Sequence, residues 1–280
     1  MGPRAQVRAR RGGTMVSIIA ASDLTVRSRE VAGRALALAG QLGARVILVH
    51  AVAPGTSAKR IADAERRLAG ELGGGMGELR VLEGRPERVI PELAGQEGAA
   101  FVVLGLHRTR PVFDILRLTT MERIVLHAEA PVVIAHTPAT HPYRTVLASI
   151  DFAPACAAAL SAAARLAVPG AEFHAIHALH LPLRDKLSPA EVEESRAMTQ
   201  AIALRDAFLR TPGLPEGLRL PEIVAGGVHE VLSFRLEELQ PDLLAIGTHS
   251  GRDPGTLGNY ARDLMRVPPT DMVVAKPPPR

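Results

Sequence analysis

One seven-residue run occurs twice in this chain, and it constrains the fold more than any other feature. The first copy is FVVLGLH at residues 101–107, and the second is LLAIGTH at residues 243–249, 142 positions later. An apolar run of this length that ends at a glycine is typical of a strand buried on both faces of a parallel sheet. The loops after such strands carry the ligand sites of α/β proteins. The two loops that follow Gly105 and Gly247 are therefore the first candidates for function.

Strands and helices alternate around the first copy. Short apolar segments predict strands at residues 16–22, 45–50, 78–82, 101–107 and 131–135. Helical patterns lie between them, at residues 28–42, 58–72, 86–97 and 116–128. The alternation predicts a parallel sheet with right-handed crossovers and helices on both faces.

The same pattern then restarts. A strand at 145–150 ends at Asp151, as the first strand ends at Asp23, 128 positions earlier. The second copy is longer, with a predicted helix at 189–209 and a loop at 212–217. This is a tandem duplication. We expect an α/β protein of two tandem Rossmann-like domains, each a five-stranded parallel sheet with helices on both faces. The predicted divisions are a disordered basic extension (1–14), domain 1 (15–138), a linker (139–143) and domain 2 (144–277).

Charge and composition exclude some functions. The sequence pI is about 9.8, but residues 1–14 carry four arginines and no acid. Without them 29 basic residues face 29 acidic ones, and aromatic residues make up only 3% of the chain. The folded part is therefore not expected to bind nucleic acid. No apolar stretch is long enough to predict a membrane span.

The single cysteine, Cys156, indicates a reducing, cytoplasmic location. It is expected in the first turn of a helix, where the helix dipole would lower its pKa. A small buried residue in an alanine-rich helix is the favoured alternative.

Taken in order, these features resemble the universal stress protein family in its tandem, two-domain form. The resemblance rests on a first strand ending in Asp, a Gly-x-Pro turn at Gly84, a fourth strand ending Leu-Gly-x-His, and the segment ERIVLHA (122–128) followed by Ala-Pro-Val. It covers residues 15–138 and 142–277, nearly the whole chain. It implies a role in stress response and the adenine-nucleotide α-hydrolase-like fold. It also implies that the last strands, 132–135 and 272–275, pair as an internal pseudo-dimer. The sequence leaves open whether whole chains form a homodimer.

Family members that bind ATP carry Gly-x-x-Gly, nine residues, then Gly-Ser/Thr after the fourth strand. Glycines let a backbone approach phosphates, and the following helix N-terminus offers N–H groups. The first repeat has the spacing but replaces two glycines, and the second keeps glycines in a loop two residues shorter. The strand-end aspartates and the ends of the second strands correspond to the adenine site, although a turn or helix-cap role is equally compatible with each aspartate. The candidate nucleotide-binding residues are Asp23, Val49, Gly105, Arg108, Thr119, Asp151, Ile176, Gly247, Ser250, Gly251, Gly258 and Asn259.

No other chemistry is indicated. The chain lacks a Gly-x-Gly-x-x-Gly fingerprint, a Walker A motif and a Gly-x-Ser-x-Gly elbow. Histidines at 50, 107, 177 and 249 are expected as polar strand-end residues rather than metal ligands.

We expect a protein that is not an enzyme. The favoured hypothesis is a stress-response protein that acts through contacts with an unknown protein partner and has degenerate nucleotide loops. The alternative is a regulatory module that binds ATP or AMP, with Mg²⁺, at one functional repeat.

Overall fold

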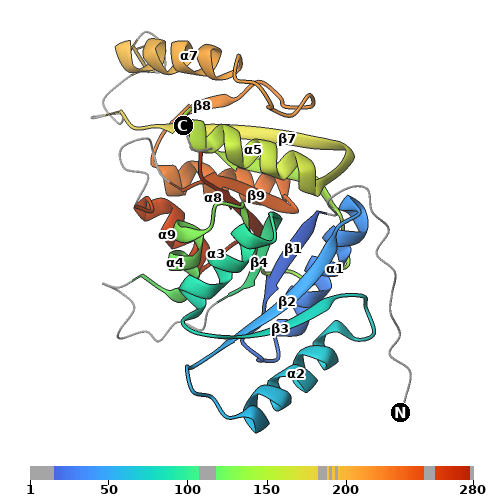
Figure 1. The fold of residues 1–280 in the computed structure, drawn as a ribbon. Coiled ribbons are helices and arrows are strands. Elements are labelled where there is room, and N and C mark those ends of the chain that lie inside the picture. The colour runs from blue at the N-terminus through green and yellow to red at the C-terminus, as the bar shows by residue number, and fades with distance from the viewer. Residues whose placement is uncertain are drawn as a thin grey trace.

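The computed structural model describes residues 16–106, 118–181, 188, 191–192, 195–248 and 256–277. Its ten strands form one continuous sheet in the order β3-β2-β1-β4-β5-β10-β9-β6-β7-β8 (Figure 1). The strands are β1 (Ser17–Ala21), β2 (Arg45–Val52), β3 (Glu78–Glu83), β4 (Ala99–Gly105), β5 (Val132–Ala135), β6 (Tyr143–Ser149), β7 (Ala167–Leu179), β8 (Glu222–Ala225), β9 (Leu243–Gly247) and β10 (Asp271–Ala275). The helices are α1 (Ser28–Leu42), α2 (Ala58–Leu72), α3 (Pro86–Gln96), α4 (Thr120–His127), α5 (Pro154–Leu166), α7 (Arg196–Phe208), α8 (Val228–Leu239) and α9 (Asn259–Arg266).

Each repeat contributes five parallel strands. The first repeat orders them β3-β2-β1-β4-β5, and the second orders them β8-β7-β6-β9-β10, in the mirror sequence along the sheet. The edge strands β3 and β8 lie at opposite ends of the molecule, with α2 beyond one and α7 beyond the other (Figure 1). The predicted fold class is confirmed.

Successive residues of the strands contribute to two apolar cores, one on each face of the sheet. Ile18 belongs to the core on one face, which includes residues of α1, α2 and α5, and its neighbour Ile19 belongs to the core on the other face, which includes residues of α3, α4, α8 and α9. Both cores run across the two repeats without a break. This arrangement follows from the two-residue period of a strand, which sends successive side chains to opposite faces.

Local signals fix the ends of several helices. Gly43 adopts the left-handed conformation (φ 62°) that ends α1, and its N–H donates to the carbonyl of Ala39. α4 begins at Thr120 and not earlier, because Thr119 and Glu122 form a capping box at its start.

Three predictions near element ends were wrong. The helix predicted at 116–128 begins only at Thr120, because Thr119 is extended and caps it. The helix predicted at 189–209 is not continuous, because Ser195 is extended and caps α7, which begins at Arg196. Tyr143, which we assigned to the linker, is the first residue of β6 and is almost fully buried.

The last strands of the two repeats join them, as predicted. β5 and β10 are antiparallel, with Val133 opposite Val273 and neighbouring pairs on either side. This pairing covers two edges that would otherwise be exposed, and it gives the chain the form of a dimer closed within one polypeptide. In the part of the chain that the structure describes, no helix is both long and apolar enough to cross a membrane.

Candidate functional site

A cavity of about 270 Å³ lies in the first repeat beyond the carboxyl ends of β1 and β4. This is where the strand order reverses, since β1 has β2 on one side and β4 on the other. Its apolar lining includes Val31, Ile90 and Leu104, and its polar lining includes Asp23 and His50. The volume is close to the roughly 300–1,000 Å³ of small-molecule sites. We call this space the first corner, and the matching space beyond β6 and β9 the second corner.

Asp23 closes a turn at the rim of the first corner. Its Oδ1 accepts hydrogen bonds from the N–H of Thr25 (3.0 Å) and the hydroxyl of Ser28 (2.8 Å). Burial raises the pKa of Asp23, but the bonds from Thr25 and Ser28 outweigh it and hold the pKa below its ordinary value. The carboxylate is therefore ionised at neutral pH and helps to fix the start of α1.

The second corner repeats this turn, with the sulfur of a cysteine in place of the hydroxyl oxygen of a serine. Asp151 Oδ1 accepts from the N–H of Ala153 (3.0 Å) and from the thiol of Cys156 (3.0 Å), so Cys156 stands where the first repeat has Ser28. Burial, followed by the charge of Asp151, raises the pKa of the Cys156 thiol. The thiol stays protonated, and the favoured sequence interpretation of Cys156 as a small buried residue agrees with its 4% exposure.

A histidine ties the strand ends together in each repeat. His50 Nδ1 donates to the carbonyl of Ser22 (2.8 Å), and His177 Nδ1 donates to the carbonyl of Ile150 (2.9 Å). Because a carbonyl only accepts, Nδ1 carries the proton in both. The Nε2 atoms remain for other partners, and His50 lines the first cavity.

The strand-end glycines differ in how closely the next helix approaches them. A Cβ on Gly105 would lie 2.9 Å from a methyl group of Val31, at the end of a side chain. A Cβ on Gly247 would lie 2.8 Å from Cβ and 3.0 Å from the backbone carbon of Ala155. The second corner is therefore closed by backbone atoms as well as by a side chain at this point, whereas the first is closed by a side-chain methyl group alone.

At the start of α4, the hydroxyl and the N–H of Thr119 already form hydrogen bonds with Glu122. Thr119 Oγ1 accepts from the N–H of Glu122 (3.2 Å), and the N–H of Thr119 donates to the Glu122 carboxylate. Thr119 keeps one hydroxyl proton to donate, but its side chain is 4% exposed. The next two residues, Thr120 and Met121, line the cavity.

Aromatic side chains pack around the second corner. Tyr260 stands in the first turn of α9, where the first repeat has Thr120, and it reaches the side chain of Ser149 at the end of β6. Its ring packs edge-on against His229 at 4.9 Å, and burial raises the pKa of its hydroxyl. On the other side, Phe152 packs on His177 at 4.8 Å and on Phe208 at 5.8 Å.

Comparison with known proteins finds the same two repeats. The model of the family described as "Universal stress protein family" matches residues 15–136 and again residues 142–276. The chain belongs to the universal stress protein family. A search of curated protein sequences found no match.

Solved universal stress proteins share the two-repeat architecture. One from Archaeoglobus fulgidus is 17% identical, with a TM-score of 0.62 over 94% of this chain and 96% of its own. A putative universal stress protein from Pseudomonas aeruginosa is 18% identical, with a TM-score of 0.60 over 94% of each chain. A single-repeat match, solved in complex with cAMP, is 21% identical and covers 43% of this chain and 96% of its own, with a TM-score of 0.36.

The remaining candidate residues of this universal stress protein fall into three groups. Val49 is buried in the sheet, and the residues after it, His50 and Ala51, form the wall of the first cavity in its place. Ile176 is also buried, and it lines a separate cavity of about 230 Å³ between β7, β8 and α8 of the second repeat. Gly258 caps α9 and donates its N–H to the carbonyl of Thr248 (3.0 Å), and Asn259 is the first residue of that helix. Predictions at Arg108, Ser250, Gly251, His107 and His249 lie outside the described residues.

No group of three or more His, Cys, Asp or Glu side chains that could hold a metal ion occurs among the described residues. Two features of the corners escaped sequence reasoning. Leu24 and Phe152, at matching positions, have positive φ (57° and 65°) although neither is a glycine. The filling role of Tyr260 was also missed, and its only signal was an aromatic residue at the place of Thr120.

Proposed function

We propose that this universal stress protein binds one adenine-nucleotide-class ligand per chain, in the first corner, and that the second repeat serves as a structural partner without a ligand site of its own. The observation that carries the proposal is the contrast at one matching position. Thr120 lines a cavity, and at the matching position of the second repeat Tyr260 places an aromatic ring that packs on His229 and reaches Ser149.

The polar lining suits a nucleoside. Asp23 presents an ionised carboxylate at the rim, and His50 has a second ring nitrogen, Nε2, beside it. The apolar lining of Val31, Ile90 and Leu104 offers contact to a flat base. Thr120, the first residue of α4, lines the cavity, and the helix dipole at this end of α4 favours an anion.

This proposal corresponds to a regulatory binding role rather than catalysis. The Mg²⁺ ion that would accompany a polyphosphate, the protein partner, the homodimer and the cytoplasmic location stay predictions. The favoured sequence hypothesis, action through protein contacts alone, differs from the proposal in one respect, since it requires that neither corner holds a ligand.

Purified protein tests the proposal directly. Denaturation followed by ion-exchange chromatography is expected to release up to one adenine nucleotide per chain, and AMP or ATP added to the stripped protein is expected to bind. The variant Thr120→Tyr copies the second corner into the first and is expected to abolish binding, while Thr120→Ser preserves it. Binding that survives Thr120→Tyr unchanged, or no binding by the stripped wild-type chain, would reject the proposal.

A further inference from the structure

The contact between the two repeats is arranged about a local two-fold axis. Val133 and Val273 are matching residues of the two repeats, 140 positions apart, and they lie opposite each other in the β5–β10 ladder. The pairs on either side, Ile134 with Met272 and Val132 with Val274, follow the same symmetry. In a symmetric dimer every contact across such an axis would occur twice.

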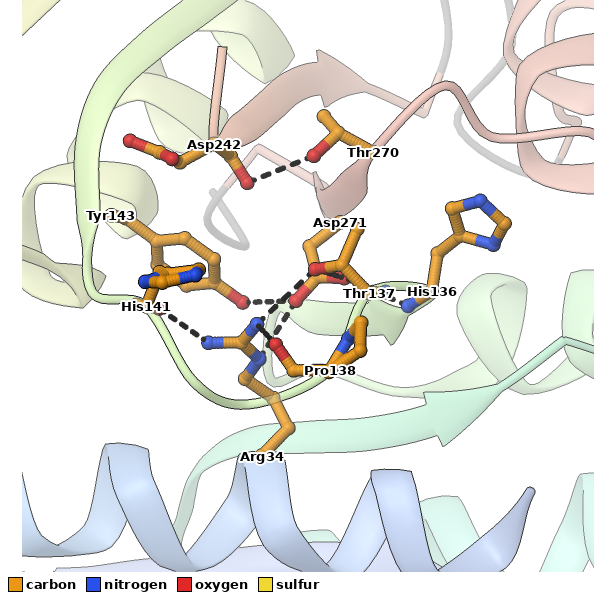
Figure 2. Close-up of polar contacts among 9 residues, drawn as sticks. All are labelled: Arg34, His136, Thr137, Pro138, His141, Tyr143, Asp242, Thr270 and Asp271. Carbon is orange, nitrogen blue, oxygen red and sulfur yellow. Dashed lines mark hydrogen bonds and ion pairs between the residues drawn. The ribbon is translucent and has the colours of Figure 1, made fainter. Parts of the chain in front are cut away.

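The polar contacts across this axis do not occur twice. Asp271, on β10, is fully buried and pairs with Arg34 of α1 at 2.8 Å, where the arginine side chain is 3% exposed (Figure 2). The other oxygen of Asp271 accepts from the N–H groups of His136 and Thr137, and Tyr143 donates its hydroxyl to the carboxylate at 2.7 Å.

Arg34 uses all three nitrogens of its guanidinium in this network. Nε pairs with Asp271, and the two terminal nitrogens donate to the carbonyls of His141 (3.1 Å) and Pro138 (3.1 Å). The guanidinium also stacks on the ring of Tyr143 at 4.7 Å. Residues from α1, the inter-repeat segment, β6 and β10 thus converge on one buried ion pair (Figure 2). At the matching positions in the opposite repeats stand an alanine (162) and a proline (131), which carry no charge.

A second buried carboxylate lies on the other face of the sheet. Glu122 of α4 is 0% exposed and pairs with Arg266 (3.0 Å) and Arg262 (3.5 Å) of α9. Glu122 and Arg262 are themselves matching residues, 140 positions apart. The position that matches Arg266 is Leu126.

From these contacts we propose that the inter-repeat surface recognises the opposite repeat and rejects a copy of itself. Two first repeats paired through β5 would place Glu122 against Glu122 and leave each buried Arg34 facing Pro131. Two second repeats paired through β10 would place Arg262 against Arg262 and leave each buried Asp271 without its arginine. Buried charges without partners are strongly destabilising, so only the pairing of unlike repeats is stable. The partner that this surface fits is the other half of the same chain.

Charge substitutions in the intact chain imitate the two rejected pairings. Arg262→Glu with Arg266→Leu gives the second repeat the side chains of the first, and therefore imitates two first repeats. Glu122→Arg places arginine against arginine, and therefore imitates two second repeats. Each change alone is expected to lower the unfolding temperature by roughly 5–10 °C.

The decisive comparison is the effect of the Arg262→Glu/Arg266→Leu change in two backgrounds. In the wild-type background it is expected to lower the unfolding temperature. In the Glu122→Arg background the same change is expected to raise the unfolding temperature, because the arginine introduced on α4 then faces the glutamate introduced on α9. Glu122→Arg also removes the capping box of α4. This loss of stability does not affect the comparison in the Glu122→Arg background, because both chains compared there lack Glu122. A shift of the same sign in both backgrounds, or a Glu122→Arg chain as stable as the wild type, overturns the proposal.

Discussion

The two corners of this protein share a backbone and differ in what fills them. In each, an aspartate closes a turn onto the first helix, a histidine ties the strand ends, and the residue after the aspartate has positive φ. The first corner then opens into a cavity lined by Thr120, and in the second corner the matching residue, Tyr260, packs on His229 and reaches Ser149. The comparison shows that the two repeats keep the same turns at the strand ends, while the side chains around those turns differ.

The largest stability difference is expected at the matching pair Tyr260 and Thr120. Tyr260→Ala removes a ring that packs on His229 and a hydroxyl that reaches Ser149, and is expected to cost about 2–4 kcal/mol of unfolding free energy, because these contacts and much of the burial of the ring are lost. Thr120→Ala, at the edge of a space that is already open, is expected to cost less than about 1 kcal/mol. Urea unfolding monitored by circular dichroism measures both. Equal losses for the two variants would mean that the second corner is not filled as described.

A smaller difference in stability between the two repeats is expected at the strand-end glycines. Gly247→Ala forces a Cβ against the backbone of Ala155 and is expected to cost about 1–3 kcal/mol. Gly105→Ala meets one methyl group of Val31 and no backbone atom, and is expected to cost less. The same unfolding experiment tests the order of the two losses, and a reversed order would contradict the closer approach of α5.

The smallest effect is expected at the rim of the first corner and depends on pH. Ser28→Ala removes one hydrogen bond to Asp23 and is expected to cost about 0.5–1 kcal/mol at pH 7. The folded-state pKa of Asp23 is lowered, so its stabilisation is present above the unfolded pKa of about 4 and is lost as the pH falls through the folded pKa. The cost of Ser28→Ala is therefore expected to shrink below about pH 4. Stability curves of both chains from about pH 2.5 to 7 span this range and provide the measurement. A cost that is constant with pH would assign the effect to packing.

The sequence was sufficient for features that depend on local pattern. Strand ends at Asp23 and Asp151, the stop of α1 at Gly43 and the duplication itself follow from apolar periodicity and turn residues, which act over a few positions. Pairing of β5 with β10 followed from family resemblance. These features needed no knowledge of distant contacts.

Features that depend on distant contacts were not predictable. Arg34 stands in an alanine-rich helix and would ordinarily be exposed, yet it is buried because its partner Asp271 lies at the far end of the chain. Glu122 reads as a helix cap, and its pairing with Arg262 and Arg266 appears only when the repeats meet. Tyr260 reads as a surface residue of a first helical turn until β6 is placed beside it.

The most direct test of the account is the number of nucleotides bound per chain. Isothermal titration of the stripped protein with AMP, and separately with ATP, is expected to give one site for the ligand that binds. Thr120→Tyr is expected to remove that site, and Tyr260→Phe, which keeps the ring in the second corner, is expected to leave it unchanged. Two sites per chain, or a single site that is lost in Tyr260→Phe and kept in Thr120→Tyr, would contradict the assignment of an open first corner and a filled second one.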